Sequence, residues 1–272
     1  MRIRIPSVRP AGQLFLSAAL LLTPPDASAQ SASADEIMAR AQEAFLGAGD
    51  DMRARVTMRL INANGRERLR EMTMLRTDLD DGEQRYFIYF HRPGDVRDMT
   101  FMVWKYRGRA DDRWLFVPAV RMVRRLAADD SRSSFVGSDF TYEDVSGRDL
   151  DADTHTLRAD EACGEATCHV VESVPKDAAA EYGRKVSWVD TETGLPRREE
   201  YYDRRGTLTR VYTADEIQEV DGYPTAVRRT MTNEVTGHRT EVVFEEVAYD
   251  LGLEVDRFSE RSLRRPPTEW VR

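Results

Sequence analysis

The stretch Met52-Arg53-Ala54-Arg55-Val56-Thr57-Met58-Arg59-Leu60 alternates strictly, with apolar or small side chains at even positions and polar ones at odd positions. Successive side chains of a β-strand point to opposite faces, so this pattern predicts a strand with one face in a core and the other in water. The buried face is expected to carry Val56, Met58 and Leu60.

Strands and turns continue beyond this stretch. Asn64-Gly65 is a hairpin signal, but the returning strand, 66–77, alternates poorly and its register stays open. Residues 84–91 (QRYFIYFH) form an aromatic-rich strand. We assign its core-facing positions to Tyr86, Ile88 and Phe90. Because both phases are apolar, Phe87 and Tyr89 remain the alternative.

Strand-like segments separated by turn residues recur to about residue 249, with one confident helix near the start. Ser33 and Glu36 form a capping box for this helix, and Gly47 and Gly49 end it. The pattern predicts a mainly β fold in which a single antiparallel sheet curls around a core. No composition break marks a linker, so we expect one domain over residues 30–272.

The first 29 residues have the pattern of a secretory signal peptide. A basic region with Arg2, Arg4 and Arg9 precedes the apolar run 14–22, and Ala27-Ser28-Ala29 supplies small residues for cleavage. The apolar run is too short to span a bilayer, which needs about 20 residues. We therefore expect a mature, soluble chain that begins at Gln30 in the bacterial periplasm, with the cell exterior as the alternative.

The chain has two cysteines, Cys163 and Cys168. In an oxidising compartment their spacing predicts a disulfide that closes a hairpin tip. A redox-active pair is disfavoured, because two intervening residues and a helix N-terminus are typical of that chemistry. His169 is adjacent, but no second ligand pair lies nearby, so no metal site is predicted.

Compact catalytic and cofactor motifs are absent from the sequence. None of the four histidines has a metal-ligand spacing, and there is no nucleophile elbow or phosphate-binding loop. We therefore expect a protein that is not an enzyme and has no cofactor, with an envelope esterase as the third hypothesis. The formal net charge of −8 argues against nucleic acid as a partner.

The segment 133–144 (SSFVGSDFTYED) interleaves aromatic residues with acids and hydroxyls. We expect Phe140 and Tyr142 to pack inward and Asp139, Glu143 and Asp144 to form an acidic rim. Such a rim suits docking to a basic surface of a partner, although the acids are about as well explained by solubility alone.

Two blocks of the sequence together resemble the outer-membrane lipoprotein-sorting, LolA-like family. They are Trp114–Leu126 (WLFVPAVRMVRRL) and 134–144 (SFVGSDFTYED). The similarity extends to the tail from Thr240 to Arg265 and covers most of the mature chain. It is closest to the branch associated with RND-type lipid exporters. The resemblance implies a strongly curved half-barrel with a few covering helices and an apolar cavity.

The same resemblance implies a periplasmic carrier that shields acyl chains of a lipid or lipoprotein between the inner and outer membranes. An inner-membrane RND-type transporter is the expected partner, and the carrier is expected to be a monomer. The alternative is an adaptor subunit of an envelope transporter that carries no cargo. The sequence does not identify the cargo or the direction of transport. It also does not show whether an arginine holds a helical lid over the cavity, or which one.

The expected cavity wall combines the residues assigned above to the strands and to the aromatic segment. It consists of Val56, Met58, Leu60, Tyr86, Ile88, Phe90, Phe140 and Tyr142.

Overall fold

The computed structural model describes Met1 and residues 32–80, 82–127, 130 and 132–272. The expected leader therefore lies outside the described residues apart from Met1. Residues 32–272 form one compact unit. Within the described residues no helix is long and apolar enough to cross a membrane.

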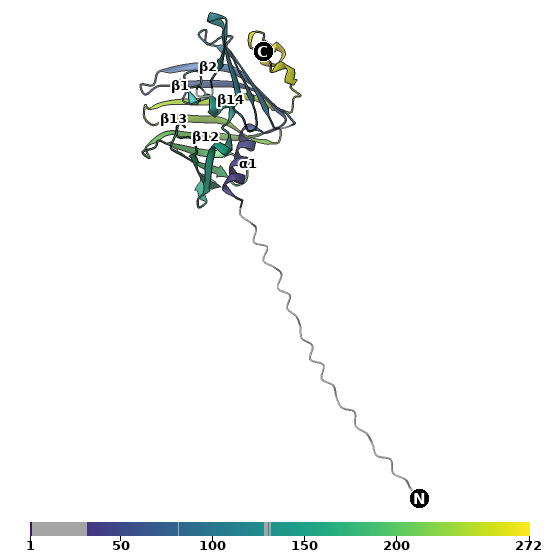
Figure 1. Ribbon diagram of the computed structural model, residues 1–272, viewed down its shortest axis with the longest axis vertical. Helices are drawn as coiled ribbons and strands as arrows, with labels where there is room; N and C mark the ends of the chain where they lie inside the picture. The colour runs from purple at the N-terminus through teal and green to yellow at the C-terminus, as the bar shows by residue number, and fades with distance from the viewer. Residues whose placement is uncertain (2–31, 81, 128–129, 131) are drawn as a thin grey trace. The chain divides into compact units, whose positions relative to one another are not determined.

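The described strands form one antiparallel sheet with β6 and β7 at its edges, which confirms the mainly β, curved-sheet prediction (Figure 1). The spatial order is β6-β5-β4-β3-β2-β1-β14-β13-β12-β11-β10-β9-β7, and β8 pairs with β9. The strands are β1 Asp51–Ile61, β2 Glu67–Asp78, β3 Gln84–Arg92, β4 Thr100–Lys105, β5 Asp112–Val117, β6 Met122–Leu126, β7 Asp153–Leu157, β8 Glu161–Cys163, β9 Ala166–Pro175, β10 Arg184–Asp190, β11 Pro196–Tyr202, β12 Leu208–Val220, β13 Tyr223–Asn233 and β14 His238–Tyr249.

Helical segments are short except for the first. They are α1 Ala34–Leu46, α2 Tyr142–Ser146, α3 Glu260–Arg264 and α4 Thr268–Val271, with single 3₁₀ turns η1 Pro118–Val120, η3 Leu150–Ala152 and η4 Val255–Arg257. The start of α1 is as predicted, because Ser33 and Glu36 form a reciprocal capping box and Gly47 is the C-cap.

The strand β1 has the two-faced character that its alternation predicts. Ala54, Val56, Met58 and Leu60 are buried, whereas Arg59 is exposed. We call the face that carries Val56 and Met58 the inner face, and the opposite face the outer face. The register of the returning strand is also settled, because Val56 pairs with Met72 and Met58 with Arg70.

The strand β3 is apolar in both phases because both of its faces are covered. Pairing places Ile88 opposite Met74, and Met74 opposite Ala54, so Tyr86, Ile88 and Phe90 belong to the inner face. Phe87 and Tyr89 lie on the outer face in a second apolar cluster.

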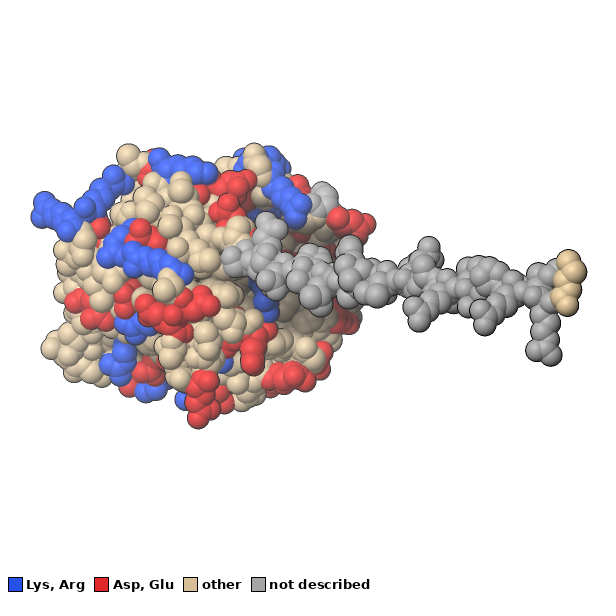
Figure 2. Space-filling view, turned by 90° about the horizontal axis from the view of Figure 1, so that it is seen from below, with Lys and Arg blue, Asp and Glu red and all other residues tan. Residues whose placement is uncertain are grey.

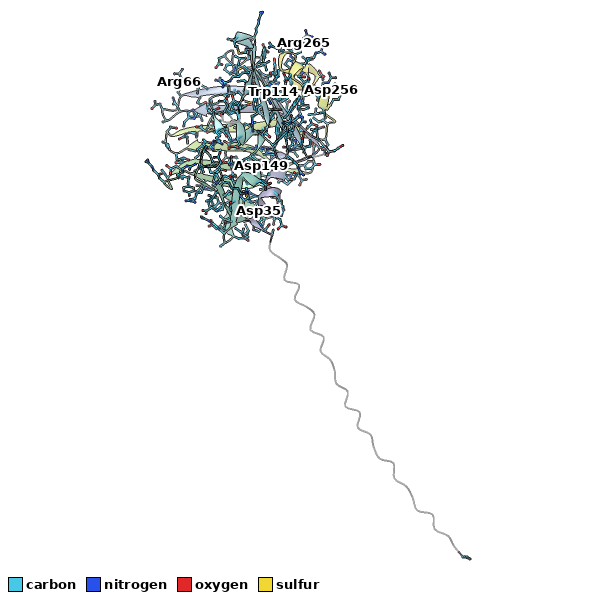
Figure 3. All side chains as sticks on the ribbon, viewed as in Figure 1. Asp35, Arg66, Trp114, Asp149, Asp256 and Arg265 are labelled. Atoms are coloured by element: carbon cyan, nitrogen blue, oxygen red, sulfur yellow. A yellow bond between two sulfur atoms is a disulfide. The ribbon has the colours of Figure 1, made fainter. Side chains whose placement is uncertain are left out.

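The C-terminal segment covers the outer face of β2–β5. Its side chains Leu253, Phe258, Leu263 and Val271 pack with Trp114 and its neighbours, in the region that Figure 3 marks with Trp114, Asp256 and Arg265. Thr100 of β4 donates a hydrogen bond of 2.8 Å to the Leu263 carbonyl oxygen, and Trp104 donates one of 2.8 Å to that of Phe258. The tail thus completes a second core, separate from the one on the inner face.

Cys163 and Cys168 form a disulfide across the tight turn between β8 and β9, as predicted. The strand beside β9 is interrupted, because both β7 and β8 pair with β9. On the surface, basic and acidic side chains are interspersed on the face shown in Figure 2.

Candidate functional site

A cavity of about 200 Å³ lies between the inner face of the sheet, α1 and the segment 135–149. Its wall is rich in flexible and aromatic apolar side chains. Six of the ten methionines and four phenylalanines line it: Met38, Met52, Met58, Met72, Met74, Met231, Phe45, Phe135, Phe140 and Phe244. Thioethers and rings of this kind adapt to an irregular apolar ligand.

Helix α1 forms the roof of the cavity. Met38, Ala41 and Phe45 contribute to the wall, and the Phe45 ring meets the edge of the Tyr212 ring with centroids 5.8 Å apart. The far side of α1 carries Asp35 and other polar residues, as expected for an amphipathic helix.

Arg76 of β2 fixes the C-terminal end of this roof. Its guanidinium donates hydrogen bonds of 2.7 Å to the carbonyl oxygens of Leu46 and Ala48, and another to that of Gly49. These carbonyls have no partner within the helix, so a buried cation satisfies them and complements the negative end of the helix dipole. The neighbouring Asp78 is partly buried, which raises the pKa of its carboxyl to about 6, although Arg76 opposes the shift.

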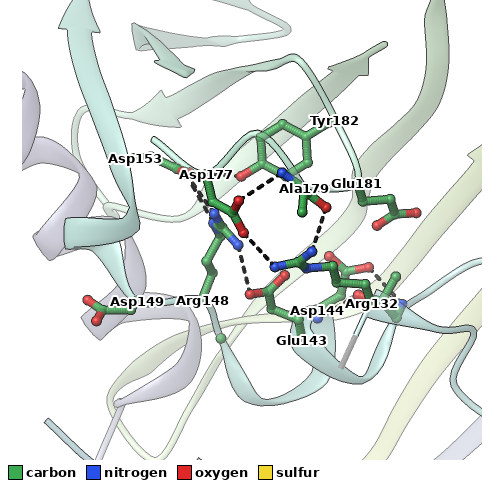
Figure 4. Close-up of polar contacts among 12 residues, drawn as sticks. Arg132, Glu143, Asp144, Arg148, Asp149, Asp153, Asp177, Ala179, Glu181 and Tyr182 are labelled. Carbon is green, nitrogen blue, oxygen red and sulfur yellow. Dashed lines mark hydrogen bonds and ion pairs between the residues drawn. The ribbon is translucent and has the colours of Figure 1, made fainter. Parts of the chain in front are cut away.

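One end of the cavity is polar and lined by ion pairs (Figure 4). Arg148 lies between Glu143 at 2.9 Å and Asp153 at 3.0 Å. Arg132 pairs with Asp177 at 2.9 Å and donates to the Ala179 carbonyl oxygen. These contacts join the segment around α2 to the loop between β9 and β10.

A second set of pairs lies on the inner face of β10–β12. Arg210 of β12 contacts Asp144 at 2.9 Å and Glu181 at 3.2 Å, and Lys185 contacts Glu199 at 2.8 Å. Burial raises the pKa of Glu181. The cavity wall is therefore mostly apolar along β1–β3, where Arg76 is the charged residue, and it is charged but internally paired along β7–β12.

A serine–histidine pair at this polar end does not form a nucleophilic site. His155 Nδ1 lies 2.7 Å from Ser173 Oγ, and its Nε2 lies 3.1 Å from the Leu150 carbonyl oxygen. Ser173 is completely buried and is not part of the cavity wall, so its hydroxyl is inaccessible to a substrate. Among the described residues no cluster of histidine, cysteine and acidic side chains has metal-binding geometry.

The predicted cavity residues divide into two groups. Val56, Met58, Tyr86, Ile88 and Phe140 lie in the wall, and their binding of lipid stays a prediction.

The other group, Leu60, Phe90 and Tyr142, is not among the residues that line this cavity. They belong to the packed core beyond it, where Phe135 fills the space. Its ring lies 6.0 Å from that of Phe90 and 5.3 Å from that of Tyr142. The segment around Phe135 thus plugs that end of the half-barrel.

The three acids of the expected rim all have partners within the chain. The side chain of Asp139 is largely buried and contacts His238 Nδ1 at 2.6 Å and the Thr240 hydroxyl at 2.7 Å. Glu143 pairs with Arg148, and Asp144 both pairs with Arg210 and caps α2 through the Thr141 backbone. The partners lie up to 101 residues away, so alternation within the segment did not reveal them. A docking role for these acids stays a prediction.

Several cavity residues escaped the sequence analysis, including Arg76, Tyr212 and Arg229. A signal was present, because each arginine stands in the apolar phase of a strand. Arg76 shares the phase of Met72 and Met74, and Arg229 shares that of Met231.

Comparison with known proteins supports the resemblance. A family model described as "Uncharacterized protein" matches residues 82–265. An outer membrane lipoprotein-sorting protein domain from Vibrio parahaemolyticus is 30% identical, with a TM-score of 0.78, and the match covers 85% of this chain and 98% of that one. The chain belongs to this family of outer-membrane lipoprotein-sorting proteins.

Two other solved structures are similar to this chain. A DUF1329 family protein from Desulfovibrio piger is 26% identical with a TM-score of 0.78, over 85% of this chain and 97% of that one. A LolA superfamily protein from Nitrosomonas europaea shares the fold at 18% identity and a TM-score of 0.67, over 85% of this chain and 99% of that one. No curated protein matches the sequence.

Proposed function

We propose that the protein is a periplasmic carrier that holds an acyl chain of a lipid or lipoprotein in the cavity beneath α1. The observation that supports this most is the composition of the wall, in which methionines and phenylalanines from β1, β2, β13, β14 and α1 converge. Apolar side chains that enclose a cavity and leave it unfilled forgo packing energy, which an apolar ligand would restore. Membership of a lipoprotein-sorting family agrees with this role.

Loading requires the roof to move. The cavity of about 200 Å³ is smaller than the roughly 300–1,000 Å³ of typical ligand sites. We infer that α1 lifts at its C-terminal end, where Arg76 binds the carbonyl groups of Leu46, Ala48 and Gly49. Arg76 is thus the candidate latch that the sequence did not single out.

The carrier exchanges its ligand with membrane-bound partners. The proposal includes an inner-membrane RND-type transporter that donates the lipid or accepts it. It also includes a monomeric state of the carrier. The paired charges at the polar end are structural in this account, because each cation there has an acidic partner within the chain.

Native mass spectrometry and organic extraction of protein purified from the periplasm test the proposal. We expect a bound species with at least one acyl chain, which is lost on extraction. Repeated preparations without acyl compounds, together with no uptake of added lipid, would contradict the carrier and favour a cargo-free adaptor.

A further inference from the structure

The side chain of Arg229 in β13 is a half-buried cation that has no acidic partner among the described residues. Its guanidinium lines the cavity, and its Nε donates a hydrogen bond of 2.8 Å to the Ala226 carbonyl oxygen. Among the described residues no carboxylate is within ion-pair distance of it. Burial lowers the pKa of Arg229, yet an arginine keeps its proton in proteins.

The other arginines and lysines that line the cavity differ from Arg229 in this respect. Arg210, Arg148 and Lys185 each contact at least one carboxylate, and Arg76 satisfies three carbonyl groups. A buried charge is costly unless a counter-charge or hydrogen bonds compensate it. Arg229 therefore has binding capacity that the chain itself does not use.

Aromatic rings hold this guanidinium in place. It lies 4.3 Å from the ring centroid of Phe45 in α1 and 4.1 Å from that of Phe244 in β14. Cation–π contacts stabilise the charge and position the group. They supply no carboxylate or phosphate oxygen, so the terminal N–H groups stay available to an anion.

A second unused donor lies beside the first. The Tyr212 hydroxyl is buried without a hydrogen-bond partner among the described residues, and its ring also contacts Phe45. A buried hydroxyl of this kind costs stability unless a ligand satisfies it. Arg229 and Tyr212 thus present two donors at one place in the cavity wall.

Apolar side chains continue from this place across the sheet. Arg229 lies opposite Val242 of β14, and Val242 lies opposite Met58 of β1. All three line the cavity. A ligand with an anionic head at Arg229 would lay its carbon chain along this row and on towards Met72.

We propose that Arg229 binds the anionic head of the acyl ligand, a carboxylate or a phosphate, with the Tyr212 hydroxyl as second donor. This inference rests on the proposed carrier function, and it deepens it by naming the ligand class as a single chain with an acidic head. A planar guanidinium suits either anion, because its N–H groups match two oxygens at once.

Three probes with the same carbon chain test the inference on the purified protein: hexadecanoate, hexadecyl phosphate and hexadecanol. We expect at least one anion to bind about tenfold or more tightly than the alcohol, as hydrogen bonds to a charged group predict. The anion that binds more tightly identifies the head-group chemistry. Equal affinity for all three probes would overturn the inference and leave the carrier intact. Binding of none would overturn both.

Two substitutions on β13 test whether Arg229 causes the preference for anions. Arg229→Met should reduce the affinity for the anions to that for hexadecanol, with hexadecanol itself little changed. Arg228→Met is the matched control, because Arg228 is the next residue on β13, is exposed and pairs with Glu216. Its anion preference should equal that of the wild type. A preference that survives Arg229→Met overturns the inference.

Tyr212→Phe provides a test that keeps the fold. It removes only a hydroxyl without a protein partner, so the core packing stays. We expect weaker binding of the preferred anion and unchanged binding of hexadecanol. An unchanged affinity for the anion would exclude the Tyr212 hydroxyl as a donor. If the Arg229→Met protein does not fold, an unchanged anion affinity of Tyr212→Phe would overturn the whole inference.

Discussion

The guanidinium of Arg76 donates a hydrogen bond of 2.7 Å to the carbonyl oxygen of Leu46, the last residue of α1. This bond joins the sheet to the roof of the cavity across 30 residues of sequence. Gln84 Nε2 also donates to the Leu46 carbonyl oxygen, at 3.2 Å, but with its further bonds to Ala48 and Gly49 Arg76 makes most of the polar contacts at this end of the roof. Access to the cavity should therefore depend on it.

Arg76→Met should loosen α1 without unfolding the sheet. Loss of three charged hydrogen bonds is expected to lower the local stability of the helix by about 2–4 kcal/mol. Hydrogen exchange of the α1 amides measures this directly, and acyl probes should enter and leave faster. Arg68→Met, at an exposed position of the same strand, is the control. Unchanged exchange in α1 would show that Arg76 is no latch.

Met58→Asn should impair both stability and ligand uptake. Met58 is buried on the inner face and lines the cavity, so the change removes apolar contacts and introduces a polar group. We expect a loss of about 2–4 kcal/mol in the free energy of unfolding. Thr57→Asn, one residue along on the outer face, should stay within about 0.5 kcal/mol. If the two substitutions have equal effects on urea denaturation and on probe binding, the two faces of β1 are assigned wrongly.

Leu263→Ala should lower stability and leave ligand binding unchanged. Leu263 is fully buried in the outer-face core, on the side of the sheet away from the cavity. Truncation of such a leucine costs about 2–5 kcal/mol. Leu251→Ala, at an exposed position before the tail, serves as control. A Leu263→Ala protein that is folded but has lost acyl binding would argue that the two cores are coupled.

Asp78 should make stability depend on pH. Burial raises the pKa of its carboxyl in the folded protein to about 6 from an ordinary value of 3.8. Between these values the folded state binds more protons than the unfolded state, so this group's contribution to stability falls as the pH rises through the window. Asp78→Asn removes the titration. The stability difference between variant and wild type, measured by urea denaturation, should shift in favour of the variant as the pH rises. A constant difference would contradict the assignment.

The sequence predicted the face of β1 correctly because one of its phases is apolar and the other polar. It did not decide the phase of β3, because the C-terminal tail covers the outer face and makes Phe87 and Tyr89 as apolar as their neighbours. It also missed the partners of Asp139 and Asp144. Those contacts join residues far apart in the chain, and only the pairing of the sheet brings them together.

Photo-crosslinking with a hexadecanoic acid that carries a diazirine in mid-chain tests the acyl-binding cavity most directly. We predict labelled peptides from β1, β2 and α1, with labels near Met58, Met72 and Phe45, and loss of labelling when unlabelled hexadecanoate competes. Labels confined to the outer face or to the tail that carries Leu263, or labelling that competitor does not reduce, would contradict the account.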